Sequence, residues 1–103
     1  MKKVINGKLY NTETAHALAE DWNGLGLSDF KHCTEILYKT PKGNYFLYGE
    51  GGPLTKYSIR SAKNWSGGID IIEFSRNEAL EWLSQKGIPS VIEREFSDLI
   101  EEA

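Results

Sequence analysis

Residues 37–53, LYKTPKGNYFLYGEGGP, constrain the fold of this chain more than any other segment. Two runs of apolar and aromatic residues flank a Pro-Lys-Gly-Asn sequence of the kind that forms tight turns. Such a pattern predicts a β-hairpin, with strands over about residues 34–48. The return strand at residues 45–48 carries no charged side chain, so we expect both of its faces to be covered and the strand to lie at the centre of a sheet.

Shorter signals predict the elements before and after this hairpin. Asn6-Gly7 lies between two apolar pieces and indicates a small opening hairpin, because this dipeptide tolerates positive φ angles. A helix is expected from residue 11 or 12 to residue 22, and a loop at residues 25–31 is expected to place Phe30 inward. The apolar residues of the expected helix recur at three- and four-residue spacing: Ala15, Leu18, Ala19 and Trp22. Further strands are expected at residues 57–60 and 69–74.

Two helices are predicted at the carboxyl end. Ser75 and Glu78 have the spacing of a capping box, and Gly87 is a stop signal for the first helix. The second helix follows Pro89 and carries an apolar stripe formed by Val91, Ile92, Phe96, Leu99 and Ile100. The sequence therefore predicts a single α+β domain over residues 1–103, in which a small antiparallel sheet packs against an N-terminal helix and two C-terminal helices.

Composition restricts the size of the core and the cellular location expected for such a domain. With 103 residues and 40% hydrophobic content, the chain can form one small core. Cys33 is the only cysteine, which excludes an intrachain disulfide, and no apolar run is long enough to span a bilayer. We therefore expect a cytoplasmic protein without a membrane partner.

Charge is distributed unevenly along the chain. Residues 31–63 contain six basic and two acidic side chains, whereas residues 70–103 contain three basic and nine acidic ones. Such segregation is informative about partners rather than about fold. The sequence thus predicts one basic and one acidic surface, and either could bind a partner.

The basic segment at residues 38–65 interleaves cations with aromatic side chains, which suits phosphate pairing and base stacking. Candidate partner-binding residues in it are Glu50, Lys56, Tyr57, Arg60, Lys63 and Trp65. Direct binding of RNA or DNA is one interpretation of this segment. The other is a solvated hairpin edge whose lysines prevent aggregation between sheets.

The acidic candidates lie on the face opposite the apolar stripe of the last predicted helix. They are Glu93, Glu95, Asp98, Glu101 and Glu102. One hypothesis is that this face occupies a basic groove on a nucleic-acid-binding partner, since complementary potentials select partners. The ordinary alternative is a solvated helix face.

No segment of the sequence contains a complete motif for catalysis, nucleotide binding or metal binding. The glycine-rich run at residues 49–53 lacks the Gly-Lys-Ser/Thr sequence of a phosphate loop, so its glycines are interpreted as positioning Glu50, Lys56 and Tyr57. His16, His32 and Cys33 lack the paired spacings of a metal site. We therefore predict no metal, no cofactor and no catalytic residue, and expect a binding protein rather than an enzyme. A hydrolytic enzyme would need a carboxylate cluster around Glu50.

Three segments within residues 4–83 also resemble a known family. They are VINGKLYNTETA, SDFKHCTEILYKTPKGNYFLYGEGGPLTKY and IIEFSRNEALEWL. The family consists of small proteins from phages, plasmids and other mobile elements of Gram-positive bacteria. Some proteins similar to it are anti-CRISPR inhibitors of the type II RNA-guided nuclease.

The resemblance implies a non-catalytic inhibitor in the cytoplasm of a bacterial host cell. It would bind the type II CRISPR nuclease and interfere with the loading of guide RNA or target DNA. The alternative is a small RNA- or DNA-binding accessory protein of a mobile element that uses the basic-aromatic segment.

Overall fold

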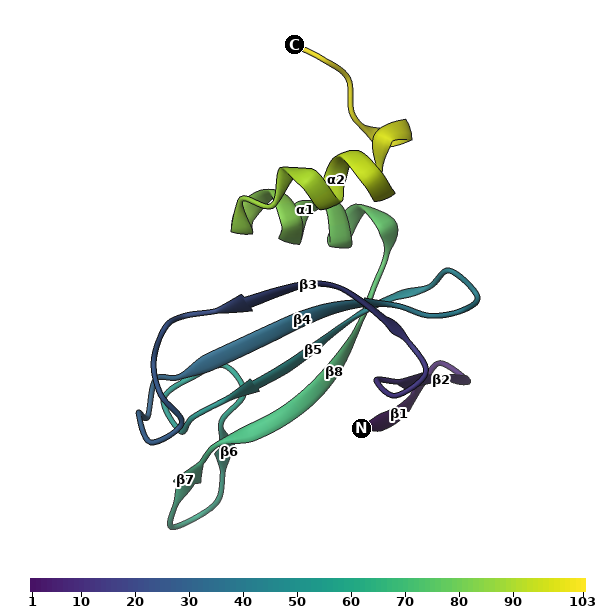
Figure 1. The fold of residues 1–103 in the computed structure, drawn as a ribbon. Coiled ribbons are helices and arrows are strands. Elements are labelled where there is room, and N and C mark those ends of the chain that lie inside the picture. The colour runs from purple at the N-terminus through teal and green to yellow at the C-terminus, as the bar shows by residue number, and fades with distance from the viewer.

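Four antiparallel strands in the order β3-β4-β5-β8 form the main sheet of the computed structural model, which describes residues 1–103. The strands are β3 (His16–Trp22), β4 (Cys33–Lys39), β5 (Tyr45–Gly51) and β8 (Gly68–Phe74). Helices α1 (Arg76–Lys86) and α2 (Pro89–Glu95) follow and cover one face of this sheet (Figure 1). A short 3₁₀ helix at Ser97–Leu99 is the last element. The fold is α+β, and none of its helices is both long and apolar enough to cross a membrane.

The predicted central hairpin is confirmed as strands β4 and β5. Leu37 lies opposite Leu47, and Gly43 in the connecting turn has a φ of 87°, which favours glycine. Phe46 and Leu47 point to opposite faces of β5 and are both buried. Strand β5 lies between β4 and β8, so its predicted central position is also confirmed.

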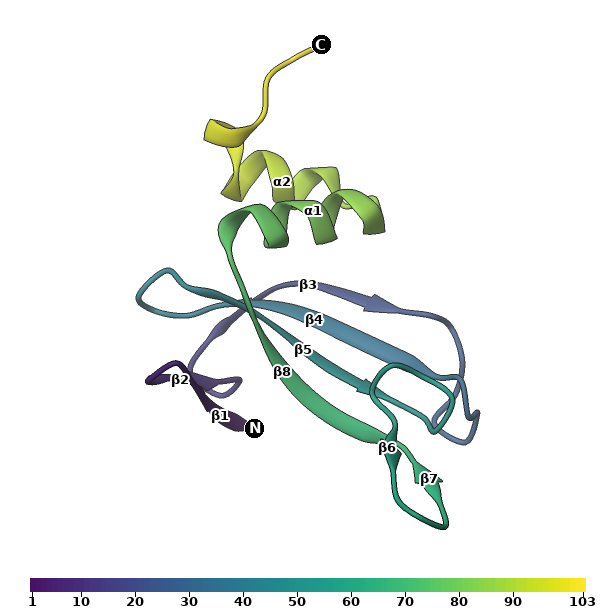
Figure 2. The same ribbon diagram turned by 180° about the vertical axis from the view of Figure 1, so that it is seen from behind.

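Two small hairpins flank the main sheet. Strands β1 (Lys2–Ile5) and β2 (Lys8–Asn11) join at Asn6 and Gly7, whose φ angles of 51° and 76° confirm the predicted turn. Strands β6 (Ile59–Arg60) and β7 (Trp65–Ser66) form a second hairpin. Figure 2 shows this hairpin projecting from the sheet beyond the start of β8. The strand expected at residues 57–60 is thus reduced to two residues.

The predicted N-terminal helix is wrong, because that segment contains the edge strand β3. Ala17 lies opposite Tyr38 and Ala19 opposite Leu37, so Leu18 is the extra residue of a β-bulge. The bulge places Leu18 in the core while the neighbouring Ala19 packs against the same cluster. Two adjacent inward residues break the two-residue alternation of a strand, and the remaining spacing imitates a helix.

The first helix begins and ends at the predicted capping residues. Ser75 and Glu78 form the capping box of α1, and Gly87 ends the helix with a φ of 69°. Helix α2 is shorter than predicted, because the backbone leaves the helical conformation at Phe96, at a φ of −129°. Leaving the helix there buries the Phe96 ring, and the predicted stripe ends before Leu99.

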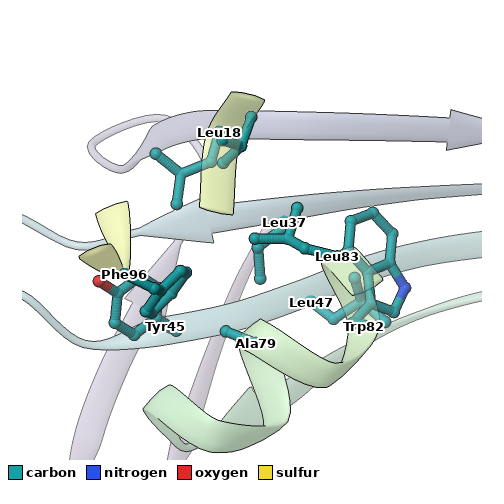
Figure 3. Packing of buried hydrophobic residues seen from close by; sticks show 9 residues of the cluster. Leu18, Leu37, Tyr45, Leu47, Ala79, Trp82, Leu83 and Phe96 are labelled. Carbon is teal, nitrogen blue, oxygen red and sulfur yellow. The ribbon is translucent and has the colours of Figure 1, made fainter. Parts of the chain in front are cut away.

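Two apolar clusters lie on opposite faces of the sheet. The larger one lies between the sheet and the helices and consists of Leu18, Leu37, Tyr45, Leu47, Ala79, Trp82, Leu83, Val91 and Phe96. Figure 3 shows the Trp82 ring beside Leu47 and Leu83. On the other face, Tyr10 of the first hairpin contacts Phe46 and Ile71. This smaller cluster covers only part of that face.

Candidate interaction surface at the loop end of the sheet

Three connecting segments meet at the end of the sheet where β3 and β5 finish and β4 and β8 begin. They are residues 23–32, residues 52–58 and the β6–β7 hairpin, and we call them the loop end (Figures 1 and 2). Backbone hydrogen bonds join the first two. The Leu54 amide donates to the Phe30 carbonyl at 2.9 Å, and the Gly52 amide donates to the His32 carbonyl at 3.0 Å. The first two segments therefore form one continuous surface.

Apolar side chains are concentrated in the three segments of the loop end. Each of the following is more than half exposed: Leu27, Phe30, Leu54, Ile59 and Trp65. The expectation that Phe30 points inward is wrong, since 65% of this residue is exposed. Clusters of exposed apolar side chains in soluble proteins mark interaction sites. Sequence reasoning missed four of these five residues, which lie in segments without a regular period.

A cation and an aromatic ring are paired in the β6–β7 hairpin of the loop end. The guanidinium carbon of Arg60 lies 3.9 Å from the centroid of the Trp65 ring, which is a cation–π contact. The two residues are also opposite each other in the β6–β7 register. Lys63 lies in the turn between them, exposed and outside any ion pair. The structure thus places three of the predicted site residues together.

A buried carboxylate connects the loop end to the core. Glu35 of β4 is only 3% exposed. Its Oε2 accepts a hydrogen bond from the Tyr57 hydroxyl at 2.5 Å and lies 2.7 Å from the Lys56 ammonium. Its Oε1 accepts from the Trp82 indole at 3.3 Å and lies 3.6 Å from the Lys86 ammonium. We call these five residues the Glu35 network, which joins β4, the loop at residues 52–58 and α1.

The ionisation of this network follows from its contacts. Burial raises the pKa of Glu35, but hydrogen bonds from Lys56, Tyr57 and Trp82 lower it more, and the pKa lies below its usual value. Burial and the hydrogen bond to Glu35 raise the pKa of the Tyr57 hydroxyl. At neutral pH, Glu35 is therefore a carboxylate, and Tyr57 is a neutral donor to it.

The lowered pKa of Glu35 predicts an acid-dependent loss of stability. A carboxyl whose pKa is lower in the folded state stabilises the fold at pH values above its unfolded pKa, about 4.3. This contribution disappears as the pH falls through the folded pKa. Urea unfolding of the wild type and of Glu35→Gln should give free energies whose difference is full near pH 7 and shrinks as the pH falls below about 4.3. A difference that stays constant across this range would contradict the assignment.

Three glycines make room for the loop that carries Tyr57. A Cβ on Gly49 would lie 1.9 Å from the Cζ of Tyr57, and one on Gly68 would lie 2.3 Å from the Tyr57 carbonyl oxygen. A Cβ on Gly51 would lie 2.2 Å from the Thr55 hydroxyl. The interpretation of the glycine-rich run as a positioning element is therefore confirmed for Tyr57. Glu50 instead lies on the opposite face of β5, where it accepts a hydrogen bond from Tyr48 at 3.2 Å.

The structure does not bring the side chains of the basic segment at residues 38–65 together. Tyr57 is buried, and Lys56 pairs with Glu35. Lys39 pairs with Glu95 at 3.1 Å, and Lys42 lies in the β4–β5 turn at the other end of the sheet. The basic segment is thus divided between two ends of the molecule.

The acidic candidates do not form one unpaired face either. Glu95 is bound to Lys39, and both oxygens of Asp98 accept hydrogen bonds from the Arg76 guanidinium, at 2.8 and 2.9 Å. The exposed acids that remain outside ion pairs are Glu93, Glu101 and Glu102. Intramolecular pairing therefore removes two of the five side chains from the acidic surface expected from the sequence.

Comparison with known proteins adds no assignment. Searches of family models, of curated proteins and of solved structures found no significant match to this chain. No group of three or more His, Cys, Asp and Glu side chains is placed to hold a metal ion. The loop end is therefore the candidate site that the geometry of the chain itself indicates.

Proposed function

We propose that this protein is a non-catalytic inhibitor of a bacterial type II RNA-guided nuclease. The observation that carries the proposal is the concentration of five exposed apolar side chains and the Arg60–Trp65 pair at the loop end. Exposed apolar clusters with charged neighbours are typical of protein interfaces, and Trp and Arg are enriched among the residues that dominate binding energy. The resemblance of residues 4–83 to mobile-element proteins supports the nuclease as the target.

Binding alone is sufficient for this activity. A type II nuclease holds its guide RNA and target strand in a channel, so a protein that occupies or distorts this channel prevents loading. In our proposal the apolar side chains of the loop end contact the nuclease. Arg60 and Lys63 contact phosphates of the guide RNA or acidic groups beside them. The inhibitor then interferes with the loading of guide RNA or target DNA.

The decisive experiment is capture of the nuclease by the full-length chain, with and without guide RNA, combined with a DNA-cleavage assay. Replacing Trp65 with alanine should weaken capture about 30-fold, since a Trp that dominates a protein interface contributes about 2 kcal/mol or more. Arg60→Ala should act in the same direction because it removes the cation stacked on that ring. Two matched controls are Leu99→Ala and Lys42→Ala, an exposed apolar residue and a cation outside the loop end.

The results of the two assays distinguish a wrong target protein from a wrong contact surface. If the wild type neither captures the nuclease nor slows cleavage, the proposed target is wrong. If it does both, and Trp65→Ala and Arg60→Ala behave like the controls, the target stands and the loop end is not the contact.

The alternative function is direct binding of RNA or DNA by the basic-aromatic segment. The residues of that segment that stay together and unpaired with acids are Arg60, Lys63 and Trp65, a footprint of two cations and one ring. A mobility shift with guide RNA alone tests it. Tight, salt-sensitive binding without nuclease that is lost on changing Lys56, Arg60 and Lys63 to alanine would favour this alternative.

A further inference from the structure

Part of one sheet face is left without a covering layer. The helices lie on one side of the main sheet, and on the other side the β1–β2 hairpin lies toward one end (Figures 1 and 2). Beyond that hairpin, two rows of side chains cross the strands on this side. One row contains Trp22, Thr34, Glu50 and Ile69, and the next contains Glu20, Ile36 and Tyr48. We call these seven residues the open face.

The open face has an apolar and aromatic base. Trp22 and Ile69 are more than half exposed at the two edges of the sheet, and Ile36 and Tyr48 lie half-buried between them. The Trp22 indole donates a hydrogen bond to the Leu25 carbonyl at 2.7 Å. This bond holds the ring in place before any partner arrives, which reduces the entropy lost on binding.

Two carboxylates stand among these side chains without a cation. Neither Glu20 nor Glu50 forms an ion pair, and neither row contains a lysine or an arginine. Burial and then the charge of Glu50 raise the pKa of Tyr48, while burial and then Glu20 raise that of Tyr38 beside it. The open face is therefore aromatic and negatively charged, in contrast to the β6–β7 hairpin of the loop end.

A small residue separates the indole from the carboxylate in the first row. Thr34 lies between Trp22 on one neighbouring strand and Glu50 on the other. Adjacent strands are about 4.8 Å apart, so the backbones at Trp22 and Glu50 are separated by about 10 Å. A guanidinium group placed over Thr34 would reach both, stacking on the indole and donating hydrogen bonds to the carboxylate.

We propose that the open face binds a segment of a partner protein that presents arginine side chains among apolar ones. The arginines pair with Glu20 and Glu50 and stack on Trp22 and Tyr48, and the apolar side chains cover Ile36 and Ile69. Nucleic acid does not fit this surface, because the carboxylates repel its phosphates. The open face is distinct from the exposed residues of the loop end, and its preference for a cationic segment holds whether or not the nuclease is the target.

The test uses the full-length chain and a blocked decapeptide of alternating arginine and leucine. Titration followed by backbone amide chemical shifts should perturb β3, β4, β5 and the start of β8. The Glu20→Gln/Glu50→Gln variant should bind the peptide at least tenfold more weakly, and so should Trp22→Ala. The matched control is Glu93→Gln/Glu101→Gln, which removes the same charge from exposed, unpaired residues outside the sheet and should change the affinity less than twofold.

Four outcomes would overturn the proposal. Equal weakening in both double variants would mean that only net charge attracts the peptide. Equal binding of a peptide with citrulline in place of arginine would mean that its charge is not needed. Perturbation of the same amides by a single-stranded RNA oligonucleotide would make the face a nucleic-acid site. A dimer in sedimentation that Trp22→Ala disperses would make the occupant a second copy of this chain.

Discussion

Replacement of Glu35 by alanine should lower the free energy of unfolding by about 3–5 kcal/mol, the usual loss when one partner of a buried ion pair is removed. The variant leaves the Tyr57 hydroxyl and the Trp82 indole as buried donors without an acceptor. Lys56 can turn to water because its side chain is 61% exposed, and Lys86 keeps Asp21 at 3.2 Å. The two buried donors and the vacated volume therefore account for most of the loss.

Urea or thermal unfolding followed by tryptophan fluorescence measures this effect. In a chain of this size, a loss of about 3 kcal/mol lowers Tm by more than about 10 °C. Glu81→Ala is the matched control, since Glu81 is exposed on α1 and its change should stay within about 0.5 kcal/mol. A loss below about 1 kcal/mol in Glu35→Ala would show that the network contributes little to stability.

Replacement of Gly49 by alanine should destabilise the protein by about 3–5 kcal/mol, through overpacking and the loss of a charge-assisted hydrogen bond. The added Cβ would lie 1.9 Å from the Cζ of Tyr57 and 2.0 Å from its hydroxyl oxygen. Both contacts are impossible, so the ring must leave the surface of β5. Its hydroxyl then loses the carboxylate of Glu35.

A double-mutant cycle isolates this clash from other effects of the substitution. With Tyr57 already changed to alanine, adding Gly49→Ala should cost less than about 1 kcal/mol, because the ring that it strikes is absent. Gly26→Ala is the control, since a Cβ on Gly26 would meet no atom within 4 Å. Additive costs of the two changes would show that the ring is not the cause. Free energies of unfolding from chemical denaturation provide all four corners of the cycle.

Local signals in the sequence predicted the parts of the fold that depend on neighbouring residues. The central hairpin follows from its turn, and Asn6-Gly7 and the Ser75–Glu78 capping box each act within a few residues. The N-terminal helix failed because the bulge at Leu18 altered the apolar period of β3. A bulge depends on how a strand pairs with its neighbour. The spacing of apolar residues along one segment contains no information about that pairing.

Long-range contacts explain why the site was predicted only in part. Tyr57 and Trp82 are 22 and 47 positions from Glu35, and no spacing rule links them. One signal was nevertheless present, since Glu35 shares a strand face with Leu37. If that face packs on the core, a charged residue on it requires partners. Arg60, Lys63 and Trp65 were named from the sequence only as partner-binding candidates, and the structure shows that they lie together because they belong to one short hairpin.

The partial cover over the second sheet face gives the molecule two regions of unequal stability. The β1–β2 hairpin is attached through the small cluster of Tyr10, Phe46 and Ile71, together with the Lys3–Asp70 pair at the sheet edge. Detaching it leaves the nine-residue cluster under the helices intact, so this opening requires less free energy than global unfolding. A minor population with the hairpin detached then exposes Phe46 and Ile71. In that state the uncovered side of the sheet extends along the full length of β5.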